Sequence, residues 1–311
     1  MNEAHLSDHA EDHDRGLAYD LGTIASRTIV RRRALAWLFT AGTTALVTGC
    51  GGGSASSGST ETASGSTTAS TGAVAETATT ATTTAPTASG STGQCVADPA
   101  ETNGPYPADG TNTSRGATSN ALTVNGIVRS DIRSSFLTST AAAPGVQVTL
   151  TLTVVDVNKA CAPLAGYAIY LWHCDRDGNY SLYDLPAESY LRGLQVTDAN
   201  GQVTFTTIFP GCYAGRYPHI HFEVFTSMAA ATNGRSARLI SQLALPSSIC
   251  TTVYNNAAGY TASISRFAQL SIANDNVFGD NSAAQVAAMT LAATGSVSAG
   301  FTATAIVGIA V

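Results

Sequence analysis

From residue 95 onward, short apolar runs alternate with clusters of glycine, asparagine and aspartate. Valine, isoleucine, threonine and phenylalanine dominate these runs, which is typical of β-strands bounded by turns. Strands are predicted over 121–128, 146–157, 167–172, 203–209, 220–225, 239–245 and 300–311. Only 261–270 and 283–292 are helix candidates, and both are short. The pattern therefore predicts an all-β sandwich with few short helices.

The first 50 residues have the features of an export signal. Arg31, Arg32 and Arg33 precede a short, moderately apolar stretch that ends at Cys50. This arrangement is typical of a twin-arginine-type signal, and the stretch is too short and too weakly apolar for a spanning helix. Val47-Thr-Gly-Cys50 resembles a bacterial lipobox, so Cys50 is expected to become a lipidated N-terminus. An ordinary export signal cleaved nearby is the alternative.

Residues 51–94 consist almost wholly of glycine, serine, threonine and alanine, with one proline. Such a segment cannot bury enough apolar surface to offset the entropy lost on ordering. We expect a flexible linker between the export signal of residues 1–50 and a globular catalytic domain over 95–311.

Composition narrows the functional classes. The chain has 311 residues, of which 12% are charged, and its formal net charge is −6. This acidic balance gives no indication of the clustered positive charge that nucleic-acid-binding proteins use. Five cysteines follow Cys50 and allow at most two disulfides, whose pairing the sequence leaves open. They are Cys95, Cys161, Cys174, Cys212 and Cys250.

The candidate chemistry lies in the segment Pro210–His221. His219 and His221 are two residues apart on a predicted strand, so their side chains share one face, roughly 7 Å apart along the chain. Two imidazoles can therefore converge on one metal ion. Tyr213 precedes them by six residues, and Tyr180 follows another strand-turn signal. Two phenolates and two neutral imidazoles form a hard, anionic donor set that suits Fe(III).

At these residues the sequence resembles the intradiol ring-cleavage dioxygenases, in particular their secreted branch. The resemblance implies a β-sandwich and iron ligands at Tyr180, Tyr213, His219 and His221. The similar blocks occur in family order over most of residues 95–280. They are Asn103-Gly-Pro-Tyr-Pro107, Val128-Arg-Ser-Asp-Ile-Arg133, Leu171-Trp-His-Cys-Asp175, Gly178-Asn-Tyr180, Leu191-Arg-Gly-Leu-Gln-Val-Thr-Asp198, Thr207-Ile-Phe-Pro-Gly-Cys-Tyr213, Gly215-Arg216, His219-Ile-His221 and Ser241-Gln-Leu243.

The same resemblance implies an activity. A family member cleaves a small aromatic 1,2-diol with O₂, between its hydroxylated carbons, to a muconate-type diacid. It needs Fe(III) and no organic cofactor. Tyr213 would act as the internal base, Arg216 would stabilise negative charge on the ring, and Gln242 would orient the substrate. The expected partners are the diol and O₂, without nucleic acid, and the membrane only through lipid at Cys50.

Two nearby tyrosines compete for the ligand positions. Tyr183 lies three residues after Tyr180, and Tyr217 lies four residues after Tyr213. The Gly-Asn-Tyr and Pro-Gly-Cys-Tyr contexts favour Tyr180 and Tyr213 as the ligands.

Other polar residues receive structural interpretations. His173 is expected to be a core histidine. Glu223 shares the strand face of the two histidines, but its Cα should lie about 13 Å from that of His219, which is too far for the same ion. Asp131 and Arg133 are interpreted as an ion pair with no catalytic role.

Three alternative functions remain open. The chain could be an iron- or catechol-binding lipoprotein without turnover, a copper oxidase with two tyrosines and two histidines, or a β-sandwich module that binds sugar or polyphenol. Metal analysis with an optical spectrum separates the copper and metal-free alternatives from an iron site. Oxygen uptake with catechols separates an enzyme from a binding protein.

Overall fold

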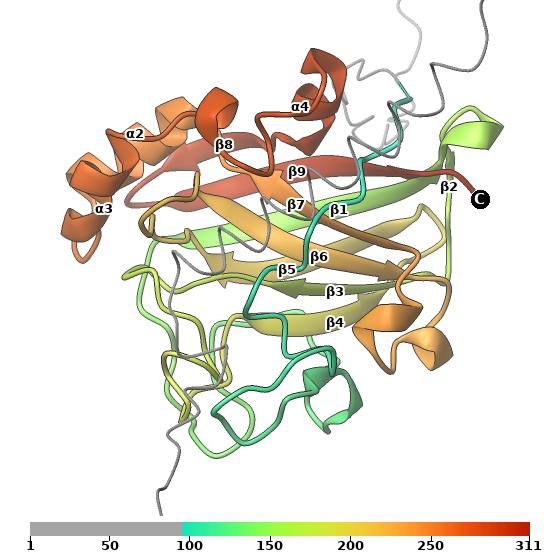
Figure 1. Ribbon diagram of the computed structural model, residues 1–311, viewed down its shortest axis with the longest axis horizontal. Helices are drawn as coiled ribbons and strands as arrows, with labels where there is room; N and C mark the ends of the chain where they lie inside the picture. Colours follow the sequence, from blue (N-terminus) through green and yellow to red (C-terminus); the bar gives the residue numbers. More distant parts are fainter. Residues whose placement is uncertain (1–94) are drawn as a thin grey trace, which may run out of the picture. The chain divides into compact units, whose positions relative to one another are not determined.

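The computed structural model describes residues 95–311, which form two β-sheets with short helices (Figure 1). One sheet has the order β2-β1-β9-β8, and β5 also pairs with β1. The other sheet has the order β4-β3-β6-β7. The predicted all-β sandwich is therefore confirmed.

The strands of the first sheet are β1 (Gln147–Asp156), β2 (Ala162–Pro163), β5 (Gln202–Ile208), β8 (Ala292–Ser296) and β9 (Gly300–Ile309). Those of the second are β3 (Ala168–Trp172), β4 (Arg192–Val196), β6 (His219–Phe225) and β7 (Leu239–Ala244).

The central strand β6 is buried along its whole length, unlike a strand with one face in water. Its even-numbered side chains Ile220, Phe222 and Val224 join the main core between the two sheets. His219 and His221 point to the opposite face, which lies beneath loops and a second apolar cluster. Alternation along one strand thus separates the packing core from the candidate chemistry.

Helices connect the later strands and end up on one side of the sandwich (Figure 1). The α-helices are α2 (Ser247–Asn256), α3 (Thr261–Phe267) and α4 (Ala283–Met289). Short 3₁₀ turns are η2 (Ala121–Thr123), η3 (Val157–Lys159), η4 (Met228–Ala230), η5 (Gly234–Ser236) and η6 (Ile272–Asn274). Both helix candidates from the sequence are confirmed as α3 and α4. Within the described chain, no helix has the length and apolar character that a bilayer span requires.

One predicted strand is wrong. Residues 121–128 begin with the turn η2, because the side chain of Asn120 accepts a hydrogen bond from the Leu122 amide and caps it. Among the strands and α-helices, four escaped prediction: α2, β2, β4 and β8. Helix α2 is rich in serine, threonine and other residues of low helix propensity, so local sequence does not favour it.

The cysteines form one disulfide in the described chain. Cys95 and Cys161 are bridged, which ties the first described residue to the turn that follows β1. Cys174, Cys212 and Cys250 are buried as free thiols. They therefore pack as small apolar side chains, the interpretation that applies to most buried cysteines.

Candidate metal centre

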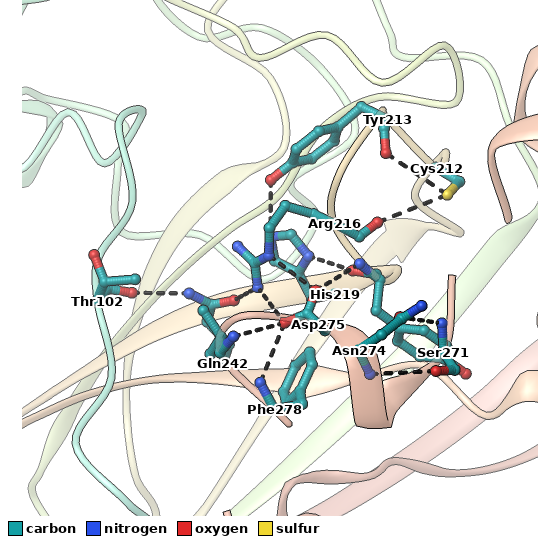
Figure 2. Close-up of polar contacts among 12 residues, drawn as sticks. Thr102, Cys212, Tyr213, Arg216, His219, Gln242, Ser271, Asn274, Asp275 and Phe278 are labelled. Carbon is teal, nitrogen blue, oxygen red and sulfur yellow. Dashed lines mark hydrogen bonds and ion pairs between the residues drawn. The ribbon is translucent and has the colours of Figure 1, made fainter. Parts of the chain in front are cut away.

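Three donor atoms converge at the outer face of β6. The Nε2 atoms of His219 and His221 lie 3.0 Å apart, and the Tyr213 hydroxyl lies 3.2 Å from Nε2 of His219. Tyr213 comes from the loop between β5 and β6, and Figure 2 shows its ring directed toward His219. The structure thus brings together three of the four predicted ligands through direct contacts.

The backbone fixes the tautomer of His219. Its Nδ1 lies 2.6 Å from the Tyr217 carbonyl oxygen, which can only accept, so Nδ1 carries the proton and Nε2 presents a lone pair. Burial, followed by the positive charge of Arg216, lowers the pKa of His219 to about 3. Burial, followed by the neighbouring His219, also lowers the pKa of His221 well below its ordinary value. Both imidazoles are therefore neutral at physiological pH, the form that binds metals.

The fourth predicted ligand, Tyr180, has a buried hydroxyl with no hydrogen-bond partner among the described residues. Its ring meets the ring of Tyr213 edge-on, with centroids 5.9 Å apart, and lies 6.1 Å from that of His221. An unpaired buried hydroxyl costs about 1–3 kcal/mol unless something binds it. Burial raises the pKa of both phenols, so a nearby cation is needed to ionise them.

The donor atoms gathered here are those that would bind a hard metal cation. Two neutral imidazole nitrogens, a phenol and an orphan phenol surround one region, and no acidic group is among them. Elsewhere in residues 95–311, no three histidine, cysteine or acidic side chains come together as a metal site. A metal held by His219 and His221 therefore needs the phenol oxygens.

Close packing positions the imidazole and the phenol. The indole ring of Trp172 stacks on the His221 ring, with centroids 4.8 Å apart and an angle of 4° between planes. Gly104, at φ +69°, approaches the same imidazole so closely that a Cβ would lie 3.2 Å from Cε1. A Cβ on Gly178, at φ +94°, would lie 3.1 Å from that of Tyr213. Each glycine thus makes room for one predicted ligand.

Arg216 lies beside the donors but is already paired. Its Nε donates to Asp275 at 3.0 Å, and its Nη2 donates to Gln242 Oε1 at 2.6 Å (Figure 2). The Gln242 amide nitrogen in turn donates to the Thr102 carbonyl at 2.9 Å. The predicted anion-holding arginine is therefore part of a buried network, and only Nη1 makes no hydrogen bond to the described chain.

Asp275 is the residue that sequence reasoning missed. It lies 59 residues after Arg216 and is fully buried as the partner in this ion pair. Burial would raise the pKa of its carboxyl, but the guanidinium of Arg216 outweighs burial and holds the pKa below the ordinary value. The carboxylate also accepts from the amides of Tyr217, Val277 and Phe278. No local motif marks such a residue in the sequence.

The rival tyrosines are engaged elsewhere. The Tyr183 hydroxyl accepts from the Ala108 amide at 2.9 Å and donates to Asn112 at 2.6 Å. The Tyr217 hydroxyl donates to the Leu245 carbonyl at 3.1 Å. Neither hydroxyl oxygen could bind a metal ion at this centre without losing a hydrogen bond.

The two remaining polar candidates lie outside the cluster. The ring nitrogens of His173 contact the Cys174 carbonyl at 2.7 Å and the Thr207 hydroxyl at 2.6 Å, which satisfies this buried histidine. Glu223 is buried next to Asp109, and burial followed by that carboxylate raises its pKa. A neutral carboxyl group at this position is a poor metal ligand.

Comparisons with known proteins find similarity to dioxygenases. A family model described as "Dioxygenase" matches residues 130–254. A curated chlorocatechol 1,2-dioxygenase from Rhodococcus opacus is 36% identical over 75 residues, which is 24% of this chain and 28% of that relative.

One solved structure extends the similarity beyond that segment. An intradiol ring-cleavage dioxygenase from Tetranychus urticae superposes with a TM-score of 0.52 at 26% identity, over 70% of this chain and 95% of its own. The structure of 3-chlorocatechol 1,2-dioxygenase from Rhodococcus opacus 1CP gives a TM-score of 0.40 at 16% identity, over 68% of this chain and 72% of its own.

Proposed function

We propose that this chain is an exported Fe(III) enzyme of the intradiol ring-cleavage dioxygenase family, to whose members it is similar in sequence and fold. Its substrate would be a small aromatic 1,2-diol, cleaved with O₂ between the hydroxylated carbons to a muconate-type diacid. The observation that carries the proposal is the convergence of the Tyr213 hydroxyl with Nε2 of His219 and His221. The orphan hydroxyl of Tyr180 supplies the fourth donor.

The four predicted ligands comprise two neutral donors and two anionic donors. His219 and His221 would contribute neutral lone pairs from a rigid, buried strand, while Tyr180 and Tyr213 would contribute phenolate oxygens. When bound there, Fe(III) supplies Lewis acidity to the diol oxygens and activates the ring toward O₂. Trp172, stacked on His221, holds that imidazole plane in place.

Tyr213 is placed to move a proton. Its hydroxyl contacts Nε2 of His219 at 3.2 Å, so it can leave that position at the cost of a single neutral hydrogen bond. Burial raises its pKa, but the positive charge of Arg216 works in the opposite direction and favours the phenolate. As a phenolate, its oxygen would accept the proton of a diol hydroxyl.

Arg216 would act from a fixed position. Asp275 and Gln242 hold its Nε and Nη2 atoms, which leaves the two N–H groups of Nη1 for negative charge on the substrate. Gln242 uses its amide oxygen on Arg216 and its amide nitrogen on the Thr102 carbonyl. Its contribution would therefore be to orient the arginine, in addition to any contact with substrate.

Metal content, colour and oxygen uptake test this proposal together. The purified protein should contain about one iron per chain and should be coloured, because phenolate bound to Fe(III) absorbs visible light. Adding catechol should change the spectrum and consume O₂. Colourless protein without iron would refute the iron proposal. Iron and colour without oxygen uptake would instead favour a catechol- or iron-binding lipoprotein.

The location of the protein is a separate part of the proposal, and its key residue lies outside the described residues. We expect Cys50 to carry lipid, because Val47-Thr-Gly-Cys50 ends an export signal. Cys50→Ala should therefore move the protein from the membrane fraction to the soluble fraction of cells. A variant that sediments with membranes as the wild type does would show that the anchor is absent or lies elsewhere.

A further inference from the structure

A cavity of about 400 Å³ lies at one end of the sandwich, apart from the candidate metal centre. Its walls come from the chain entering β1, the end of α2, the turn between β8 and β9, and the loop after β3. None of the four predicted iron ligands lines it. Its lining includes Gly145, Arg176, Asn256, Ala258, Ser298 and Ala299.

Arg176 is the one charged side chain among the lining residues of this cavity. Its Nε atom is buried and has no hydrogen-bond partner among the described residues. Oδ2 of Asp177 lies 3.8 Å from it, within the range of an ion pair but beyond hydrogen-bond distance. A buried N–H of a charged group without an acceptor is costly, so this guanidinium keeps hydrogen-bonding capacity that the described residues do not use.

The guanidinium is held in place by close packing on a glycine. A Cβ on Gly259 would lie 2.5 Å from both Cζ and Nε of Arg176, so the absence of a side chain there makes room for the group. Gly259 has φ +89°, which also favours glycine. Only 30% of the arginine side chain is exposed. The donor is therefore positioned before any ligand arrives.

We propose that this cavity binds a small organic carboxylate. A carboxylate can accept two parallel hydrogen bonds from the accessible N–H groups of a guanidinium, and the Arg176 side chain is partly exposed where it lines this cavity. The other lining side chains are neutral: Asn256, Gln147 and Ser298 offer hydrogen bonds, and Val146 and Val297 offer apolar contact. Such walls suit an uncharged carbon skeleton, and the volume falls within the range of small-molecule sites.

Binding of benzoate, followed by amide chemical shifts of the whole protein, tests this inference. Benzoate should shift the amides of Ala258 and Ala299 saturably, and benzyl alcohol, which lacks the charge, should not. Inorganic phosphate serves as the test of a general anion site. Shifts confined to His219 and Tyr213, or no saturation up to about 10 mM benzoate, would overturn the proposal. Phosphate binding as tight as benzoate would also overturn it.

Two variants separate the arginine from the shape of the cavity. Arg176→Gln should weaken benzoate at least about tenfold, the size expected for a charge-assisted hydrogen bond. Ala258→Phe leaves the arginine intact but places a ring in the cavity from an exposed position, and it should also weaken benzoate. Arg235→Gln, at an exposed arginine outside the cavity, is the matched control and should bind as the wild type does. Equal affinity in all three variants would refute the site.

This inference does not rest on the proposed function. Benzoate binding is measured without iron turnover, and the residues that line the cavity are not those proposed to hold iron. Loss of colour or of oxygen uptake would leave the carboxylate site untouched, and loss of benzoate binding in Arg176→Gln would leave the iron proposal untouched.

Discussion

Replacing Tyr180 with phenylalanine should remove most of the visible colour of the iron-loaded protein and weaken iron binding more than about tenfold. The hydroxyl of Tyr180 is buried and has no hydrogen-bond partner in the described chain, so its loss removes no hydrogen bond within the fold. The free energy of unfolding of the metal-free protein should therefore stay the same or rise slightly. A residue with a purely structural role would show the opposite pattern.

Tyr213→Phe should have a different signature, because this hydroxyl contacts His219 and is the proposed proton acceptor. Iron should bind more weakly, and the spectrum should still respond to catechol. Turnover should fall by about 10²–10⁴, the usual contribution of a positioned acid or base. Iron titration, the optical spectrum and oxygen uptake on one set of proteins distinguish the two tyrosines.

Tyr183→Phe and Tyr217→Phe are the matched controls. Their hydroxyls bond to the Ala108 amide and the Leu245 carbonyl, respectively, so each variant should lose about 1 kcal/mol of stability. The visible band and the iron affinity should be retained in both. If the visible band persists in both Tyr180→Phe and Tyr213→Phe, the protein binds a metal but the assignment of these two tyrosines as ligands is wrong.

The sequence predicted the parts of the fold that depend on local pattern. Most strands were found because apolar runs between turn residues are visible along the chain. The strand β4 was not, since Gly193 and the buried Arg192 interrupt its pattern. Arg192 is buried because carbonyls from Tyr106, Pro107 and Ser181 surround its guanidinium, and those contacts are distant in sequence.

The site was predictable to the extent that its residues lie in recognisable motifs. The His-x-His spacing alone places two imidazoles on one strand face. The state of Arg216 was not predictable, because its partner Asp275 lies on a loop after α3 with no motif of its own. The role of Gly104 also depends on a long-range approach, since it contacts the imidazole of His221. Tertiary contacts of this kind leave no periodic trace in a sequence.

Asp275→Ala should destabilise the protein by about 3–5 kcal/mol, because it leaves the buried charge of Arg216 without its partner. The amide of Tyr217 would lose its acceptor as well. Urea unfolding measures the change. Asp131→Ala removes a partner of similar geometry, the predicted ion pair with Arg133 at 2.7 Å, but at an exposed site, and should cost less than about 1 kcal/mol.

The dependence of this stabilisation on pH supplies a second readout. The pKa of Asp275 lies below its ordinary value in the folded protein, so the folded state gains stability from the ionised carboxylate. That gain is present above the pKa of an unfolded aspartate, about 4, and is lost as the pH falls through the lower folded value. The wild type should therefore lose stability on acidification more steeply than Asp275→Ala. Two results would show that Arg216 does not depend on this carboxylate. The free energy of unfolding could fall equally steeply with acidification in the wild type and in Asp275→Ala, or Asp275→Ala could lose no more stability than Asp131→Ala does.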